Sequence, residues 1–240
     1  MPLVMSAVAL PFYGVWAKSL ATGGGDLAAQ FAWAQFMARH PGSAYNLSWY
    51  GGMHIFNYSV LAPVVMALFG VRTVSVAAGL AGTWAMAALL VRAQVRRPLW
   101  PALLGAVTLW CNVASGRTTF ALGAAVALLA LLMLLTSDCC AARAVCAVLA
   151  GLSAFASPVA GVFLVVAGAA FLLDRQWVKA ASLIVPPVML TGAVTLVFPF
   201  HGEQPMPMAK LWMPLAVCAA LWWAAPQGWH LVRSPTPPES

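Results

Sequence analysis

Side chains that could do chemistry are scarce in this 240-residue chain, because charged residues make up only 7% of it. Outside the basic clusters, a few polar residues are of types that transfer protons, bind phosphate or contact a polar substrate. We single out six of them as candidate site residues: Asp26, Tyr50, His54, Arg117, His201 and Glu203. Asp26 is the candidate catalytic residue, and the other five are candidate substrate-binding residues.

Asp26 follows three glycines and precedes a helix-compatible stretch over residues 27–39, which stops at Pro41-Gly42. A carboxylate in this position has two interpretations. It could cap the N-terminus of the helix, which contributes about 1 kcal/mol. It could also act as a general base that takes a proton from an acceptor hydroxyl. One residue can fill both roles, so both stay open.

Arg117 lies in a Ser-Gly-Arg turn between two apolar runs. An arginine at the end of an apolar helix often extends to the membrane interface or to a lipid headgroup. Its guanidinium group also suits phosphate, because it makes bidentate contacts with phosphate oxygens. Both interpretations place Arg117 at a membrane surface, and only the second makes it a substrate ligand.

The remaining candidates lie in two loops. Tyr50 and His54 belong to an aromatic, turn-rich stretch and would shape an acceptor site, although a lone histidine is more often an interfacial polar residue. His201 and Glu203 could contact a substrate or a metal, but their spacing is not a recognised metal signature. We therefore predict no cofactor, and a divalent metal is an alternative without support.

The composition of the chain indicates which kind of structure positions these residues. Hydrophobic residues make up 63% of the chain, against about 45–50% in soluble domains. The apolar runs are continuous, as membrane helices require over roughly 17–25 residues, and lack the alternation of a membrane β-barrel. We predict an all-α, polytopic membrane protein with membrane lipids around it. The net charge of +7 then serves membrane topology, and we predict no nucleic-acid binding. The five cysteines are interpreted as small apolar packing residues.

Eight runs are long or apolar enough to be candidate spans. They cover residues 2–17, 73–91, 99–114, 118–135, 142–156, 158–173, 180–199 and 211–225. The apolar segment 58–69 is not counted, because twelve helical residues rise only about 18 Å and Pro63 interrupts them. We expect one multi-pass domain over residues 1–230, with juxtamembrane helices at about 27–39 and 58–70. We expect a disordered, cytoplasmic tail over residues 231–240.

Basic residues set the predicted orientation. If 58–69 does not cross and the N-terminus is inside, the cluster Arg92, Arg96 and Arg97 faces the cytoplasm, as the positive-inside rule requires. Both termini are then cytoplasmic. All six candidate site residues then fall on the outer side, in three loops that are distant in sequence. We expect these loops to meet at one outward-facing site.

The outer segment resembles that of the GT-C fold glycosyltransferases. A first span is followed by an outer loop with an early aspartate, Asp26, and then by two juxtamembrane helices and a second span. The run over residues 49–61 (WYGGMHIFNYSVL), with Leu68-Phe69-Gly70, is similar to a pattern in related uncharacterised bacterial membrane proteins. The resemblance implies a seven-span module and use of a polyprenyl-phosphate sugar. It also implies catalysis by Asp26 and phosphate binding by Arg117.

The chain departs from that family in two ways. Asp26 has no acidic neighbour, where many members carry a paired acidic motif, and the chain stops soon after its eighth span. A truncated or uncharacterised member therefore fits the resemblance as well as a complete enzyme does.

Three classes of function remain open. A glycosyltransferase-like enzyme uses the outer candidates, whereas a transporter usually carries ionisable residues within its spans, and these spans hold almost none. A non-catalytic membrane subunit or scaffold fits small-residue faces such as Gly79-Leu-Ala-Gly82. The Ala-rich, Lys-poor composition indicates a bacterial protein of the cell envelope, which we place in the plasma membrane.

Overall fold

The computed structural model describes residues 1–49, 52–199 and 207–228. This part of the chain is all-helical apart from one pair of two-residue strands, and it holds ten α-helices. The helices are α1 (Pro2–Val15), α2 (Asp26–Arg39), α3 (Ala62–Phe69), α4 (Val71–Arg92), α5 (Leu99–Ala114), α6 (Thr118–Thr136), α7 (Cys140–Ala156), α8 (Pro158–Leu173), α9 (Trp177–Val197) and α10 (Met208–Gly228). A π-helical turn, Trp16–Leu20, continues α1.

The chain divides into two compact units. The main unit comprises Met1–Gln94 with Pro98–Phe200, and the second comprises Val95–Arg97 with His201–Ser240. The main unit holds α1 to α9. The second holds α10, a single apolar helix.

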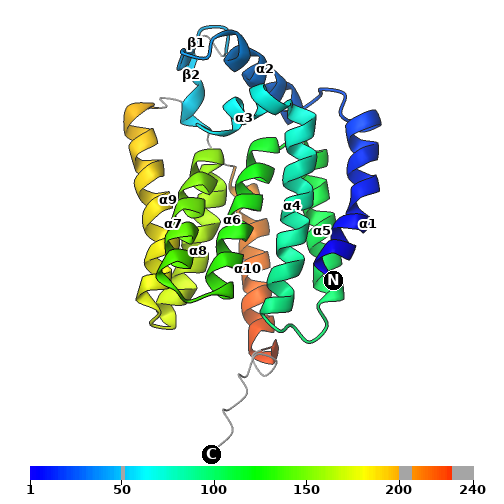
Figure 1. Cartoon of the computed structure of the whole chain (residues 1–240), viewed down its shortest axis with the longest axis vertical. Coiled ribbons are helices and arrows are strands. Elements are labelled where there is room, and N and C mark those ends of the chain that lie inside the picture. The colour runs from blue at the N-terminus through cyan, green and yellow to red at the C-terminus, as the bar shows by residue number, and fades with distance from the viewer. Residues whose placement is uncertain (50–51, 200–206, 229–240) are drawn as a thin grey trace, which may run out of the picture. The chain divides into compact units, whose positions relative to one another are not determined.

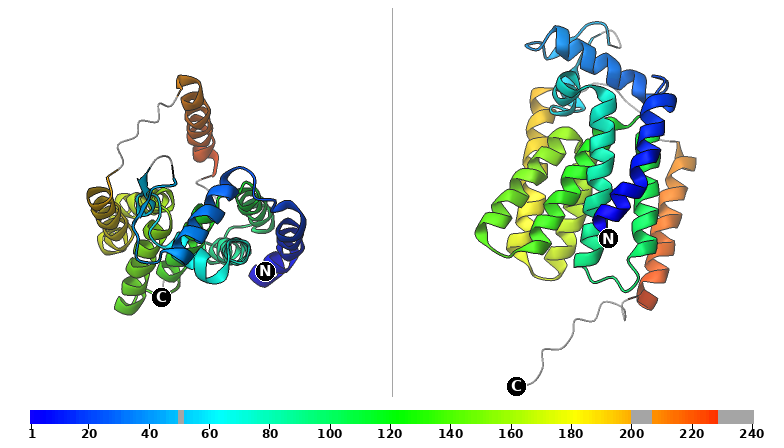
Figure 2. Two further views of the ribbon diagram at one scale, coloured as in Figure 1. Left: turned by 90° about the horizontal axis from the view of Figure 1, so that it is seen from above. Right: turned by 45° about the vertical axis from the view of Figure 1, so that its right-hand side comes forward.

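In the main unit, α1 and α4 to α9 form a bundle in which successive members run in opposite directions (Figure 1). Helix α4 packs against α1, α5 and α6, and α7 packs against α6, α8 and α9. Helices α2 and α3 lie at one end of this bundle, with α2 across the helix axes (Figure 2). The strands β1 (Tyr45–Asn46) and β2 (Met53–His54) pair antiparallel at the same end. We call this end, with the turn at residues 115–117, the α2 end.

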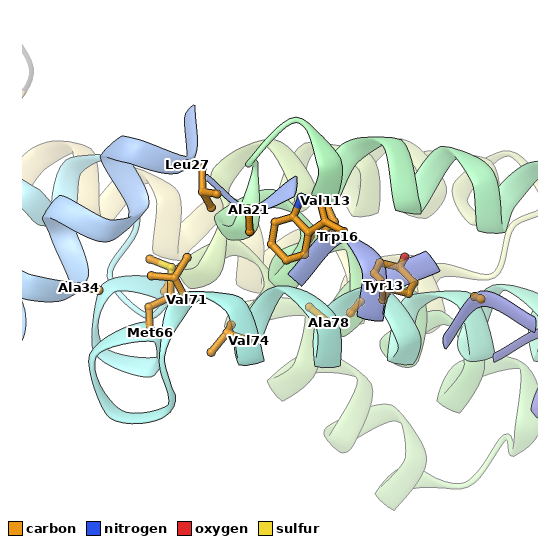
Figure 3. Close-up of a cluster of buried hydrophobic side chains, with 14 residues drawn as sticks. Tyr13, Trp16, Ala21, Leu27, Ala34, Met66, Val71, Val74, Ala78 and Val113 are labelled. Carbon is orange, nitrogen blue, oxygen red and sulfur yellow. The ribbon is translucent and has the colours of Figure 1, made fainter. Parts of the chain in front are cut away.

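Small residues let the helices of the bundle approach closely. The aromatic ring of Tyr13 on α1 lies over Gly79 on α4, in the space that a side chain at residue 79 would occupy. Tyr13 and Trp16 are almost fully buried in a cluster that reaches Leu27 and Met66 at the α2 end (Figure 3). This cluster fixes α2 and α3 onto the bundle.

A second apolar cluster joins α6, α7, α8 and α9, and the buried thiol of Cys146 belongs to it. The packing role predicted for cysteine is therefore confirmed at Cys146. It is wrong for Cys111, Cys139 and Cys140, which are exposed free thiols, and it stays a prediction for Cys218 in the second unit. Exposure is expected for two of them because they begin α7.

Local sequence determines where the helices end. Gly70 separates α3 from α4 with φ of 82°, and Gly116 separates α5 from α6 with the same φ, a conformation that favours glycine. Ser157 adopts an extended conformation before Pro158, as the residue before proline usually does. Each break turns the chain back at the α2 end.

Each of the eight predicted spans coincides with one α-helix to within three residues at each end. Among the described residues, four helices are long and apolar enough to cross a membrane: Pro2–Leu20, Val71–Arg92, Thr118–Thr136 and Trp177–Val197. The other predicted spans correspond to shorter apolar helices, Leu99–Ala114, Cys140–Ala156, Pro158–Leu173 and Lys210–Ala220. A helix of 16 residues such as α5 rises about 24 Å. The prediction of an all-α fold is therefore confirmed, and four of the described helices are candidate membrane spans, whereas the count of eight spans stays a prediction.

The two juxtamembrane helices differ in how well their bounds were predicted. Helix α2 matches the expected 27–39 to within one residue. The expected helix 58–70 instead begins at Ala62, because the backbone N–H groups of Val60 and Leu61 both donate to the carbonyl of Phe155. The Ser59 hydroxyl accepts from the Ala62 N–H at 3.0 Å and so marks the helix start. The predicted tail, 231–240, lies outside the described residues.

Candidate functional site

Asp26 and Arg117 form an ion pair at the α2 end. Asp26 is the first residue of α2, Arg117 directly precedes α6, and 91 positions separate them in sequence. The Arg117 Nε donates to the Asp26 Oδ2 at 3.2 Å. The side chains are 58% and 64% exposed for Asp26 and Arg117. The two most chemically informative candidates are therefore in contact, and both are accessible to a ligand.

The turn before α6 brings Arg117 to Asp26. A Cβ atom at Gly116 would lie 2.5 Å from the backbone nitrogen of Leu27, so the two backbones touch at this point. The Ser115 hydroxyl donates to the carbonyl of Asn112 at 2.7 Å, which holds the turn together. Arg117 is thus positioned by backbone packing, and the ion pair alone does not have to hold it.

The capping interpretation of Asp26 is wrong. The N-cap position is Gly25, with φ of 59°, and no side chain caps the helix. Asp26 is the next residue, in the first turn of the helix, where the positive end of the helix dipole stabilises a negative charge. Its carboxylate is free of a capping role and is oriented towards Arg117 instead.

Polar contacts tie α4 to α6 and to the loop that precedes α2. Arg72 donates from Nη2 to the carbonyl of Ala21 at 2.8 Å, which fixes the start of the loop before α2. The hydroxyls of Ser75 on α4 and Thr118 on α6 share a hydrogen bond of 2.7 Å, and both residues are buried. Sequence analysis missed these residues, because an arginine or a hydroxyl at a helix start is common and gives no signal by itself.

His54 lies in β2 and packs against aromatic rings, not against the ion pair. Its ring packs edge-on against Tyr45, with centroids 5.0 Å apart, and at a tilt against Phe198 at 5.4 Å. The Nδ1 atom of His54 is buried and has no hydrogen-bond partner in the described part of the chain. The structure does not bring His54 to the ion pair. Tyr50, His201 and Glu203 lie outside the described residues.

A second group of aromatic rings packs on α2. Trp33 makes an edge contact with Trp49, with centroids 5.6 Å apart, and a tilted contact with Tyr58 at 5.2 Å. A small pocket adjoins this region, where Tyr58 and Ser59 meet Phe155 and Thr191. The pocket is mostly apolar and does not include the ion pair.

The site offers acid–base and anion-binding chemistry. A carboxylate such as that of Asp26 accepts a proton, and the guanidinium of Arg117 has four N–H groups beyond the one it gives to Asp26. Within the residues the structure describes, no group of three or more His, Cys, Asp or Glu residues could hold a metal ion. No protein-family model, no curated protein and no solved structure matches the chain.

Proposed function

We propose that this protein is a glycosyltransferase-like membrane enzyme. It transfers a sugar from a lipid-linked phosphate donor, a polyprenyl-phosphate sugar, to an acceptor at the extracytoplasmic face. In this proposal the chain lies in the bacterial plasma membrane with eight spans and cytoplasmic termini. The α2 end then faces outward.

The order of the helices supports this proposal. The bundle of the main unit has seven helices, α1 and α4 to α9. Between α1 and α4 in the chain come α2 and α3, which lie at one end of the bundle. This order resembles the GT-C module of seven spans with two juxtamembrane helices after the first. Eight-residue α3 rises about 12 Å, which suits a segment that does not cross.

In the proposed reaction, the two members of the ion pair have separate roles. Asp26 takes the proton of the acceptor hydroxyl while the oxygen of that hydroxyl bonds to the anomeric carbon of the sugar. The bond from that carbon to the phosphate oxygen breaks, and the lipid phosphate leaves with the electron pair. Arg117 binds the phosphate and stabilises the charge that develops on it.

The observation that carries the proposal is the contact of Asp26 with Arg117 at the α2 end. For this chemistry, the general base and the residue that binds the phosphate must both reach the same bound donor. Asp26 and Arg117 are in contact although they are distant in sequence.

The proposal is tested in cells by exchanging Asp26 for Asn and profiling glycolipids and envelope glycans. The chain offers a matched control, Asp138→Asn, because Asp138 forms the other described ion pair, with Lys179 at 2.8 Å, away from the α2 end. Asp26→Asn should reproduce the glycan defect of a deletion, and Asp138→Asn should not. A defect in the deletion strain with a normal profile in Asp26→Asn contradicts the proposal.

A further inference from the structure

The inner face of α2 carries a polar residue in an apolar stripe. Leu27, Gln30, Ala34 and Met37 follow helical spacing and are all buried against the bundle, and Trp33 flanks them. Gln30 is only 4% exposed, and its Oε1 atom has no hydrogen-bond partner within the described residues. A buried acceptor without a partner is unfavourable, and an apolar residue there would be more stable.

Trp33 presents the complementary atom. It is 9% exposed, and its Nε1 is also buried without a partner among the described residues. Residues three apart on a helix are neighbours on its surface. Thus one unused hydrogen-bond acceptor, from Gln30, and one unused donor, from Trp33, belong to residues three positions apart on α2. A hydroxyl group both donates and accepts, so it satisfies this pair of atoms.

The surroundings of the two residues match a sugar better than a simple alcohol. The ring of Trp33 belongs to the aromatic group with Trp49 and Tyr58, and small-ligand sites combine such apolar walls with a few placed polar groups. Gln30 follows Asp26 by four residues, a rise of about 6 Å along the helix, which is roughly the span of one sugar ring. A sugar on Gln30 would therefore reach Asp26.

We infer that Gln30 and Trp33 form a binding site for the hydroxyl groups of a sugar, under α2 and next to Asp26. This inference rests on the proposed function in one respect: it identifies the bound sugar with the glycosyl group of the lipid-linked donor. The hydroxyl chemistry is shared by free and lipid-linked sugars, so the test must separate these two sources.

Access to this site requires α2 to move away from the bundle. Glycines precede the helix at residues 23–25, and Gly42 follows it; a side chain at any of these positions would meet nothing within 4 Å. At the start of α2, the exposed ion pair with Arg117 adds to the packing of Leu27 against Gly116, and exposed ion pairs are weak. Binding of a phosphate by Arg117 would remove the ion pair, so that only the packing of α2 would oppose its movement and the entry of the sugar.

The test measures thermal unfolding of the full chain in detergent with a thiol-reactive dye, in a protein whose other four cysteines are replaced by serine so that the buried Cys146 is the reporter. Three probes are compared: a polyprenyl phosphate, the same lipid carrying a hexose, and a free methyl hexoside. The variant is Gln30→Leu, and the matched control is Gln35→Leu, since Gln35 is exposed on the same helix. Trp33→Phe, which removes the indole N–H and keeps a smaller aromatic ring, is the second variant.

The hexosyl lipid should raise the Tm of the wild-type protein more than the bare lipid phosphate does. Gln30→Leu should weaken the response to the hexose about tenfold in apparent affinity, leave the response to the bare lipid intact, and raise the Tm of the ligand-free protein. Trp33→Phe should weaken the same hexose response, and Gln35→Leu should keep both responses. A response to the methyl hexoside alone would identify a free sugar as the ligand and still support the site.

Two results would overturn the inference. One is a wild-type protein that shows no hexose-dependent shift with either sugar source, and the other is a Gln30→Leu protein that keeps the shift. The proposed function fails separately. If the wild-type protein transfers no sugar but its hexose-dependent shift is lost in Gln30→Leu, the binding site stands and the transfer reaction does not.

Discussion

Gly116 and Leu27 are in backbone contact: a Cβ atom at residue 116 would lie 2.5 Å from the Leu27 nitrogen and 2.9 Å from its Cα. Gly116 also has φ of 82°. The turn that carries Arg117 therefore reaches the helix that carries Asp26 only because residue 116 is glycine. The ion pair depends on this close approach.

Gly116→Ala should separate the turn from α2 and break the ion pair. The substitution forces a strained backbone and a collision with Leu27, and we expect a loss of stability of about 1–3 kcal/mol. Thermal unfolding in detergent measures it. Gly42→Ala is the control, because a side chain there meets nothing within 4 Å, and it should leave the Tm within about a degree or two. Equal Tm values for the two variants would contradict the close approach.

Gly79→Ala should loosen the packing of α1 on α4. A methyl group at residue 79 collides with the ring of Tyr13, which is buried on all sides. Overpacking of this kind typically costs about 1–3 kcal/mol, and thermal unfolding again measures it. Gly14→Ala, in α1 with nothing within 4 Å of the added methyl group, should be neutral or stabilising. A stabilised Gly79→Ala protein would show that α1 does not pack in this way.

The helices can be predicted from the sequence, but the contacts between them cannot, because those contacts join residues that are distant in sequence. Continuous apolar runs and the Gly and Pro breaks depend on local preferences, so α2 is predicted to within a residue. The start of α3 depends instead on the carbonyl of Phe155, almost a hundred positions away. Such a contact leaves no local pattern.

In the candidate site, too, the residues can be recognised from the sequence but their contacts cannot. Asp26 and Arg117 are recognisable by residue type and by their places beside apolar runs, but their contact is tertiary. Gln30 was missed because a glutamine within a helix usually faces water. Only the packing of α2 on the bundle shows that Gln30 is buried.

Cys139 should report which end of the bundle faces the cytoplasm. It is exposed at the start of α7, at the end opposite α2. With the other four cysteines replaced, a membrane-impermeant maleimide should label it only after spheroplasts are permeabilised. Ala38→Cys in a cysteine-free chain places a thiol on the exposed side of α2 and should be labelled in intact spheroplasts. The reverse pattern would contradict the proposed orientation.

The same thiol should react at lower pH than an ordinary cysteine. Hydrogen bonding with the Ser137 side chain, and then with the backbone N–H of Ala142, lowers the pKa of Cys139. Because the thiolate is the reactive form, the labelling rate should reach half its maximum at a lower pH than in Ser137→Ala. The single-cysteine Cys140 protein serves as a neighbouring reference. Identical pH profiles with and without Ser137 would contradict this effect.

The role of Asp26 as the base is the central claim, and the initial rate of sugar transfer tests it most directly. Purified protein in liposomes is supplied with a hexosyl polyprenyl phosphate and with a cell-envelope extract as the source of the acceptor, and release of the polyprenyl phosphate is followed. Asp26→Asn should slow this rate by about 10²–10⁴-fold, the usual contribution of a general base, while Asp138→Asn keeps the wild-type rate. A rate in Asp26→Asn that equals that of Asp138→Asn would contradict the account.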